Sequence, residues 1–188
     1  VLCADTVDVD LRSPLEFELF FSLCSLMIDN LLLRTGLSMK DITGIGIAIP
    51  GRSIDDGQAV LVENFPCLRN VDIRQQFQQK YGKPVMVDDC SQLMALAELH
   101  LGSGRGSDSF VVFDLGLGIG CGIVINNAIY MGHGKKAGEI GHTIVERDGP
   151  LCRCGRHGCI ESLASGWFLH AVGTEYIKTH PDEILARL

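Results

Sequence analysis

The most informative part of this chain is Cys152-Arg153-Cys154-Gly155-Arg156-His157-Gly158-Cys159, preceded by Gly138-Glu139-Ile140-Gly141-His142. Three thiols lie within eight positions, and an imidazole lies ten residues upstream of the first thiol. Thiolate sulfur and imidazole nitrogen are the ligands that Zn²⁺ prefers in tetrahedral structural sites. Gly155 and Gly158 allow the sharp turns that bring three sulfurs to one ion. The pattern therefore predicts a zinc site formed by His142, Cys152, Cys154 and Cys159.

An alternative for the same stretch is one disulfide with a free thiol. Cys152 and Cys154 are separated by a single residue, which is too close for an easy bridge, and nothing else in the sequence indicates secretion. We therefore favour the metal. Four protein ligands leave no open position for water or substrate, so the predicted ion is structural rather than catalytic. It would hold the neighbouring acids Glu139 and Glu161 near one rigid point.

The composition is that of an ordinary globular protein. The sequence has 188 residues, of which 46% are hydrophobic and 21% charged. The net charge of −7 and the absence of a basic stripe argue against this chain itself binding DNA or RNA. Eight cysteines without a signal peptide indicate a reducing compartment, and we expect the cytoplasm. The longest apolar run, 17–33, contains Glu18, Asp29 and Asn30 and is too polar to span a membrane.

Apolar periodicity predicts an alternation of strands and helices. We expect strands at 1–12, 45–49, 60–62, 85–87, 110–113, 119–125 and 128–130. We expect helices at 14–34, 71–81, 91–101, 160–164 and 167–178. The first helix should have Ser13 as N-cap, Pro14 at its first position and Gly36 as its end. This order predicts an α/β fold, with residues 103–108 as a candidate hinge between two lobes.

Further motifs accompany the two that open this section. In chain order they are Ile49-Pro50-Gly51, a loop with Asn64, Val87-Asp88-Asp89 and Gly116-Leu117-Gly118-Ile119-Gly120. A glycine motif alone is weak, but Glu-x-Gly-His followed by this cysteine pattern is highly specific. From about residue 44 to 166 the ordered set resembles the ROK family, which contains repressors and sugar kinases.

The resemblance implies an actin-like ATPase (ribonuclease H-like) fold of two α/β lobes with a hexose-type sugar in the cleft. We expect an N-terminal lobe at 1–106 that lacks the family's first phosphate-loop hairpin. Residues 107–188 should begin a C-terminal lobe that carries the zinc loop 142–159 and stops before it is complete. The family also binds zinc with residues that match the four ligands above. It holds sugar hydroxyls with residues that match Asn64, Asp89, Glu139, His142 and Glu161.

Several residues of these motifs also have a simpler interpretation. Asp89 could only cap the helix that follows it. Glu139 and Glu161 could be surface acids, although their places beside the zinc loop argue against this. Gly116 and Gly118 could belong to a tightly packed hairpin, or their amides could hold nucleotide phosphates.

Three departures separate the chain from the kinases of the family. It has no Asp-x-Gly-x-Thr phosphate loop, it has Asp88-Asp89 where kinases carry Asn-Asp, and it has Leu117 where they carry Thr. We therefore expect the sugar-sensing domain of a ROK-type transcriptional regulator, without enzymatic activity, whose DNA-binding part lies outside this chain. The resemblance suggests a homodimer or homotetramer, and no membrane partner is expected.

The alternative is a fragment of an ATP-dependent kinase that phosphorylates a hexose or an N-acetylhexosamine. ATP and Mg²⁺ would then be cofactors, and Asp89 would be the catalytic base that takes the proton of the attacking hydroxyl.

Overall fold

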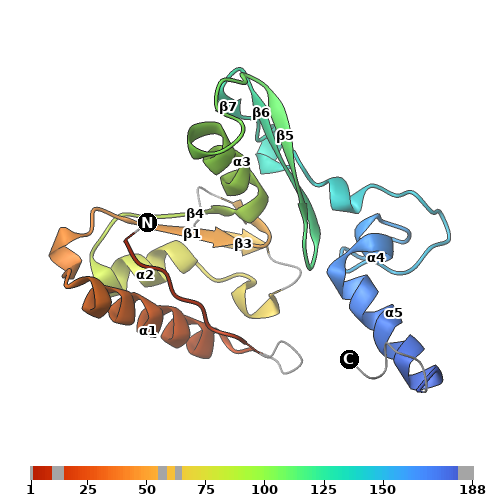
Figure 1. Cartoon of the computed structure of the whole chain (residues 1–188), viewed down its shortest axis with the longest axis horizontal. Coiled ribbons are helices and arrows are strands. Elements are labelled where there is room, and N and C mark those ends of the chain that lie inside the picture. The colour runs from red at the N-terminus through yellow and green to blue at the C-terminus, as the bar shows by residue number, and fades with distance from the viewer. Residues whose placement is uncertain (1, 10–14, 55–58, 62–64, 182–188) are drawn as a thin grey trace. The chain divides into compact units, whose positions relative to one another are not determined.

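A computed structural model of the chain describes residues 2–9, 15–54, 59–61 and 65–181 (Figure 1). Contacts within the chain divide it into two units, Val1–Asp89 and Cys90–Leu188. Each unit has its own cluster of buried apolar side chains. No helix among the described residues is long and apolar enough to cross a lipid bilayer.

The first unit is built on a parallel strand pair. β1 (Ile45–Ile49) pairs with β4 (Val85–Asp89), and a second, antiparallel pair joins β2 (Arg52–Ile54) to β3 (Ala59–Leu61). The helices α1 (Phe17–Thr35) and α2 (Ile73–Tyr81) lie on one side of the β1–β4 pair (Figure 1). The described residues of this unit also form two short 3-10 turns, η1 (Met39–Asp41) and η3 (Pro66–Leu68). Its buried core comprises Ile49, Leu68, Ile73, Phe77, Val85 and Val87.

The second unit begins with a helix packed on an antiparallel sheet. α3 (Cys90–Leu101) is followed by β5 (Phe110–Leu115), β6 (Ile119–Ile125) and β7 (Ala128–Ile129), in the spatial order β5-β6-β7. α3 packs on one face of this sheet, where Ala95, Leu99 and Val124 are buried together. A side chain at Gly122 would collide with the Ser91 carbonyl and the Ala95 methyl group, so glycine allows this close approach.

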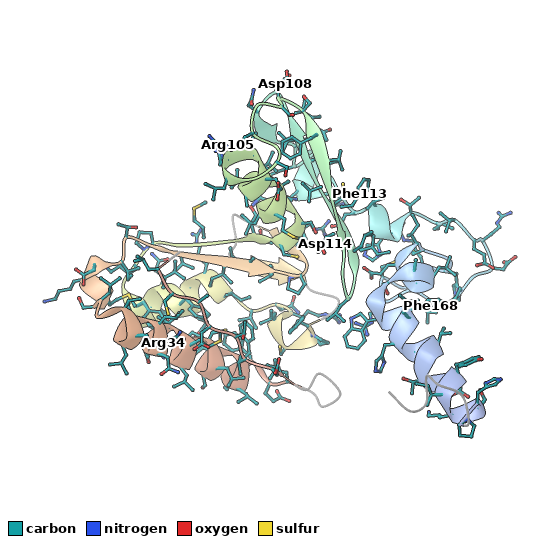
Figure 2. All side chains as sticks on the ribbon, in the orientation of Figure 1. Arg34, Arg105, Asp108, Phe113, Asp114 and Phe168 are labelled. Atoms are coloured by element: carbon teal, nitrogen blue, oxygen red, sulfur yellow. The ribbon has the colours of Figure 1, made fainter. Side chains whose placement is uncertain are left out.

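Side chains of β5 alternate between the two faces of the sheet. Figure 2 shows the neighbours Phe113 and Asp114 on this strand. Val111, Phe113 and Leu115 are exposed on the face away from α3, and the Phe113 side chain is 58% exposed. β5 thus carries an apolar stripe that the described residues leave uncovered.

The rest of the second unit has little regular structure before its last two helices. It contains η4 (His133–Lys135), η5 (Ile140–His142), α4 (Glu161–Ala164) and α5 (Gly166–Thr179). The long loop between η5 and α4 carries the three clustered cysteines. Two isolated antiparallel bridges, Ile144 with Cys159 and Leu151 with His157, fold this loop back on itself.

The α/β class and most expected elements are confirmed, with two corrections at the N-terminus. The strand expected at 1–12 is wrong for residues 2–9, which form no regular element. Alternation alone does not make a strand, because its amides and carbonyls also need a partner strand. The first helix begins at Phe17, three residues after the expected start at Pro14, because its N-cap Glu16 is still extended, with φ −83° and ψ 151°. Gly36 ends the helix with a φ of 69°, as expected. The expected cap residues Ser13 and Pro14 lie outside the described residues.

The expected lobe boundary at residue 106 stays a prediction. In this structure α3 contacts β5 and β6 and falls within the second unit.

Candidate functional site

The four expected metal ligands come together in the second unit. The ligand atoms of His142, Cys152, Cys154 and Cys159 all lie within 4.8 Å of one another. Nδ1 of His142 is 3.6 Å from the Cys152 sulfur, and the sulfurs of Cys154 and Cys159 are 3.7 Å apart. Ligands placed about 2.3 Å from a tetrahedral zinc ion lie about 3.8 Å from each other. The donor set and its spacing therefore fit a zinc ion.

Backbone hydrogen bonds shape the loop around these ligands. The Cys152 amide donates to the Arg156 carbonyl at 2.7 Å, and the Gly155 amide donates to the Cys152 carbonyl at 2.9 Å. Gly158 has a φ of 67°, and a Cβ there would collide with the Glu146 carbonyl. The loop turns back tightly only because this position lacks a side chain.

The three thiols differ in how easily they ionise. Burial raises the pKa of Cys152 to about 12 and also raises that of Cys159. Burial acts in the same direction on Cys154, but hydrogen bonds from Arg156 and from the other two thiols outweigh it and lower its pKa to about 7. Without a cation, Cys154 is therefore the thiol of the cluster that ionises most readily. A bound zinc ion would supply the positive charge that deprotonation of the other two requires.

Glu139 and His142 are held next to strand β6 by two glycines. Side chains at Gly138 and Gly141 would collide with the carbonyls of Cys121 and Ile119, so the turn lies directly against the strand backbone. Nε2 of His142 is 3.9 Å from a carboxylate oxygen of Glu139, while Nδ1 faces the thiols. One imidazole nitrogen is thus available to a metal while the other lies near an acid.

Glu161 holds the turn between β5 and β6. It is the first residue of α4, and its Oε2 accepts a hydrogen bond from the Ile119 amide at 2.9 Å. The Gly116 amide donates to the Gly118 carbonyl at 3.1 Å. A phosphate role for Gly116 and Gly118 stays a prediction, and the Gly116 amide would have to exchange its present partner for a phosphate oxygen.

The remaining expected sugar residues do not lie in this unit. Asp89 ends β4 in the first unit, directly before α3, and Asn64 lies outside the described residues. Asp88, which precedes Asp89 in β4, accepts hydrogen bonds from the Ser53 hydroxyl at 3.2 Å and from the Asp89 amide at 3.1 Å. The structure therefore brings Glu139 and His142 together and places Glu161 in the same unit. The convergence of all five on one cleft stays a prediction.

Sequence reasoning missed two basic residues of the metal loop. Arg156 hydrogen-bonds the Cys154 sulfur, and the Arg153 guanidinium lies 4.3 Å from the centre of the Trp167 ring. The sequence did contain a signal for them. Arg153 directly precedes Cys154 and Arg156 follows it by two positions, and nearby basic residues stabilise a thiolate. Nothing in the pattern pointed to Trp167, because its contact joins separate parts of the chain.

Comparison with known proteins gives consistent matches. The ROK family matches residues 25–187. The glucokinase of Thermotoga maritima is 34% identical over 146 residues, which are 77% of this chain and 46% of the relative. The xylose repressor of Bacillus subtilis is 33% identical over 139 residues, which are 74% of this chain and 36% of the relative. The chain thus spans less than half the length of these two relatives.

A solved structure has the same fold over most of the chain. It is a ROK family glucokinase from Streptomyces griseus in complex with glucose and AMPPNP, with a TM-score of 0.77 and 29% identity. The match covers 90% of this chain and 53% of the glucokinase. This likeness supports the expected fold class, and the relatives include both a sugar kinase and a repressor. On the motifs, the matched range and these relatives, the chain belongs to the ROK family.

Proposed function

We propose that this chain is the sugar-sensing part of a ROK-type transcriptional regulator, with DNA contacts made by a region outside it. The turn between β5 and β6 supports this choice over a kinase. Where the family's kinases place a threonine, this turn has Leu117, which has no hydroxyl for a phosphate. The Gly116 amide is bonded within the turn, and the carbonyls of Gly116 and Leu117 accept from the first amides of α5. The xylose repressor relative agrees with this proposal.

The sugar would be a hexose-type ligand held by Asn64, Asp89, Glu139, His142 and Glu161. Carboxylate, amide and imidazole groups suit sugar hydroxyls, and a site built for them rejects analogues that lack the hydroxyl. Glu139 and His142 already form a polar pair beside the metal cluster. A sugar that binds one conformation of the regulator better than another would shift its population and so its DNA binding.

The metal would be a structural zinc ion held by His142, Cys152, Cys154 and Cys159. Its chemistry is to hold the loop and to orient His142, whose second ring nitrogen then faces Glu139. With four protein ligands, no step of a reaction takes place on the ion. Cytoplasmic location and assembly as a homodimer or homotetramer complete the proposal.

The second candidate is part of an ATP-dependent sugar kinase. The glucokinase relative and the glucokinase structure with AMPPNP favour it, as does Asp89 at the carboxyl end of β4. Asp89 would then be the base for the attacking hydroxyl, and Mg²⁺ with ATP would occupy the glycine turn.

The deciding experiment uses the full-length protein that contains this chain. It is mixed with ATP, Mg²⁺ and a panel of hexoses, N-acetylhexosamines and pentoses, and ADP release is followed beside operator binding. If the chain is a sensor domain, we expect sugar to reduce operator binding without ATP turnover. Glu139→Ala should then weaken sugar binding by about 1–3 kcal/mol. ADP release at ordinary kinase rates, about 1–100 per second, would instead establish the kinase.

A further inference from the structure

Arg153 lies between two of the candidate metal ligands. Its neighbours in the chain are Cys152 and Cys154, so an ion bound to both sulfurs would fix the backbone on either side of it. Its guanidinium lies 4.3 Å from the ring centre of Trp167, within the distance of a cation–π contact. Trp167 is the only tryptophan of the sequence and the second residue of α5.

The contact between Arg153 and Trp167 borders a partly open pocket between the loop and the helices. A cavity of about 270 Å³ lies between them, and its lining includes Leu151, Arg153, Glu161, Trp167 and Phe168. The buried indole nitrogen of Trp167 has no hydrogen-bond partner among the described residues. The ring is therefore oriented by the groups packed on it, and the Arg153 guanidinium is one of them.

The other end of this contact reaches the glycine turn. The Trp167 amide donates to the Leu117 carbonyl at 3.3 Å, and the Gly166 amide donates to the Gly116 carbonyl at 2.9 Å. Gly166 is so close to this turn that an added Cβ would lie 2.9 Å from the Gly116 oxygen. The start of α5 is thus joined to the turn between β5 and β6, in addition to the bond that Glu161 accepts from Ile119.

We propose that Arg153 and Trp167 are positioning residues through which the metal loop holds the start of α5 and, with it, the glycine turn. The inference rests on the proposed zinc ion. It adds that the ion stabilises the turn at 116–119, which lies outside the metal loop 142–159. Loss of the ion would free Arg153, release the Trp167 ring and loosen the turn at 116–119. Trp167 would at the same time report the state of the metal by its fluorescence.

The test compares zinc-loaded and chelator-stripped full-length protein, with zinc content measured in each sample. The readouts are tryptophan emission, assigned to residue 167 by its loss in Trp167→Phe, and amide hydrogen exchange of residues 115–120. In the wild type, stripping should move the emission to longer wavelength and accelerate exchange, and added zinc should reverse both. Zinc-loaded Arg153→Met should already show the stripped emission and exchange, while Arg153→Lys should retain part of the effect. Arg147→Met, which removes an exposed arginine from the same loop, is the matched control and should behave as the wild type.

A second variant is needed in case Arg153→Met fails to bind zinc, because Arg153 lies between two candidate ligands. Trp167→Leu changes a residue of α5 that is not one of the four candidate ligands, and its zinc-loaded form should show the accelerated exchange of 115–120. The proposal is overturned if zinc-loaded variants exchange as slowly as the wild type, or if stripping leaves the wild-type turn unchanged. Absence of bound zinc in the wild type overturns the metal proposal together with this one, whereas bound zinc with an unresponsive turn overturns this one alone.

Discussion

At the scale of single residues, the metal loop depends on two glycines that differ in surroundings. Gly155 and Gly158 both have positive φ, at 85° and 67°. A Cβ at position 155 would meet nothing within 4 Å, whereas one at 158 would collide with the Glu146 carbonyl. The sequence predicted that both glycines turn the chain, but it could not show which one also makes a close backbone contact.

This difference predicts that alanine at position 158 lowers stability and zinc retention more than alanine at position 155. Gly155→Ala should cost only the backbone strain of a left-handed alanine, about 1–2 kcal/mol. Gly158→Ala carries the same strain and must also move the Glu146 carbonyl, so it should cost more and lower zinc retention. Competition with a chromophoric zinc chelator measures the retention. Equal loss in both variants would mean that the close contact at 158 has no energetic weight.

The unequal thiol pKa values predict site-selective alkylation of the metal-free protein. The pKa of Cys154 is lowered to about 7, so its thiolate fraction grows as pH rises through neutrality. Its reaction with iodoacetamide should accelerate between about pH 6 and 8. Cys152, with a pKa raised to about 12, should react slowly throughout this range. Peptide mass spectrometry assigns the sites, and a faster reaction at Cys152 would contradict the prediction.

At the scale of elements, the strands expected at 110–113, 119–125 and 128–130 are present in the second unit, where they form two hairpins. The Asn126-Asn127 pair has φ values of 53° and 59°, and both residues lie in the left-handed region that such a two-residue turn requires. The Gly-rich pattern likewise marked the turn at 116–118. The contact of α5 with that turn could not be predicted, because backbone amides and carbonyls join there without any side-chain signature.

The exposed apolar stripe of β5 predicts that threonine substitutions at two neighbouring positions, one on each face of the strand, have different effects. Phe113 faces away from α3, while Val112 packs against the buried cluster under that helix. Phe113→Thr should reduce binding of a hydrophobic dye and self-association, with stability changed by no more than about 0.5 kcal/mol. Val112→Thr should leave dye binding at the native level and cost about 1 kcal/mol by placing a hydroxyl against the core. The reverse order of stability effects would mean that the two faces are misassigned.

At the scale of the whole molecule, the two units differ in what stabilises them. The first has an extended apolar cluster that includes an edge contact between the rings of Phe21 and Phe77, with centroids 4.8 Å apart. The second has a smaller buried cluster of Ala95, Leu99 and Val124, and the candidate metal ligands lie outside it. The sequence predicted the α/β class, and the lobe boundary at residue 106 stays a prediction. The packing of α3 on β5 and β6 is a tertiary contact that periodicity does not reveal.

Removal of the proposed zinc ion should act on the second unit more than on the first, because its four candidate ligands all lie in the second unit. A strong chelator should lower the melting temperature of the second unit and accelerate amide exchange in α4, since Glu161 follows Cys159 closely. Exchange in α2 of the first unit should remain unchanged. Calorimetry with exchange measured by mass spectrometry makes the comparison, and equal destabilisation of both helices would contradict the assignment of the ion to the second unit.

The pairing registers also determine how the chain finds its native state. Leu115 and Ile119 pair across a turn of three residues, whereas Ile45 pairs with Val85, 40 positions along the chain. Closing a loop ten times longer costs about 2 kcal/mol more in chain entropy. Hairpins form within about 1–10 μs, so β5 and β6 should gain amide protection early in refolding and β1 and β4 later. During synthesis, β1 leaves the ribosome before β4 has been made, and the backbone amides and carbonyls along its edge must wait for β4 before they can pair.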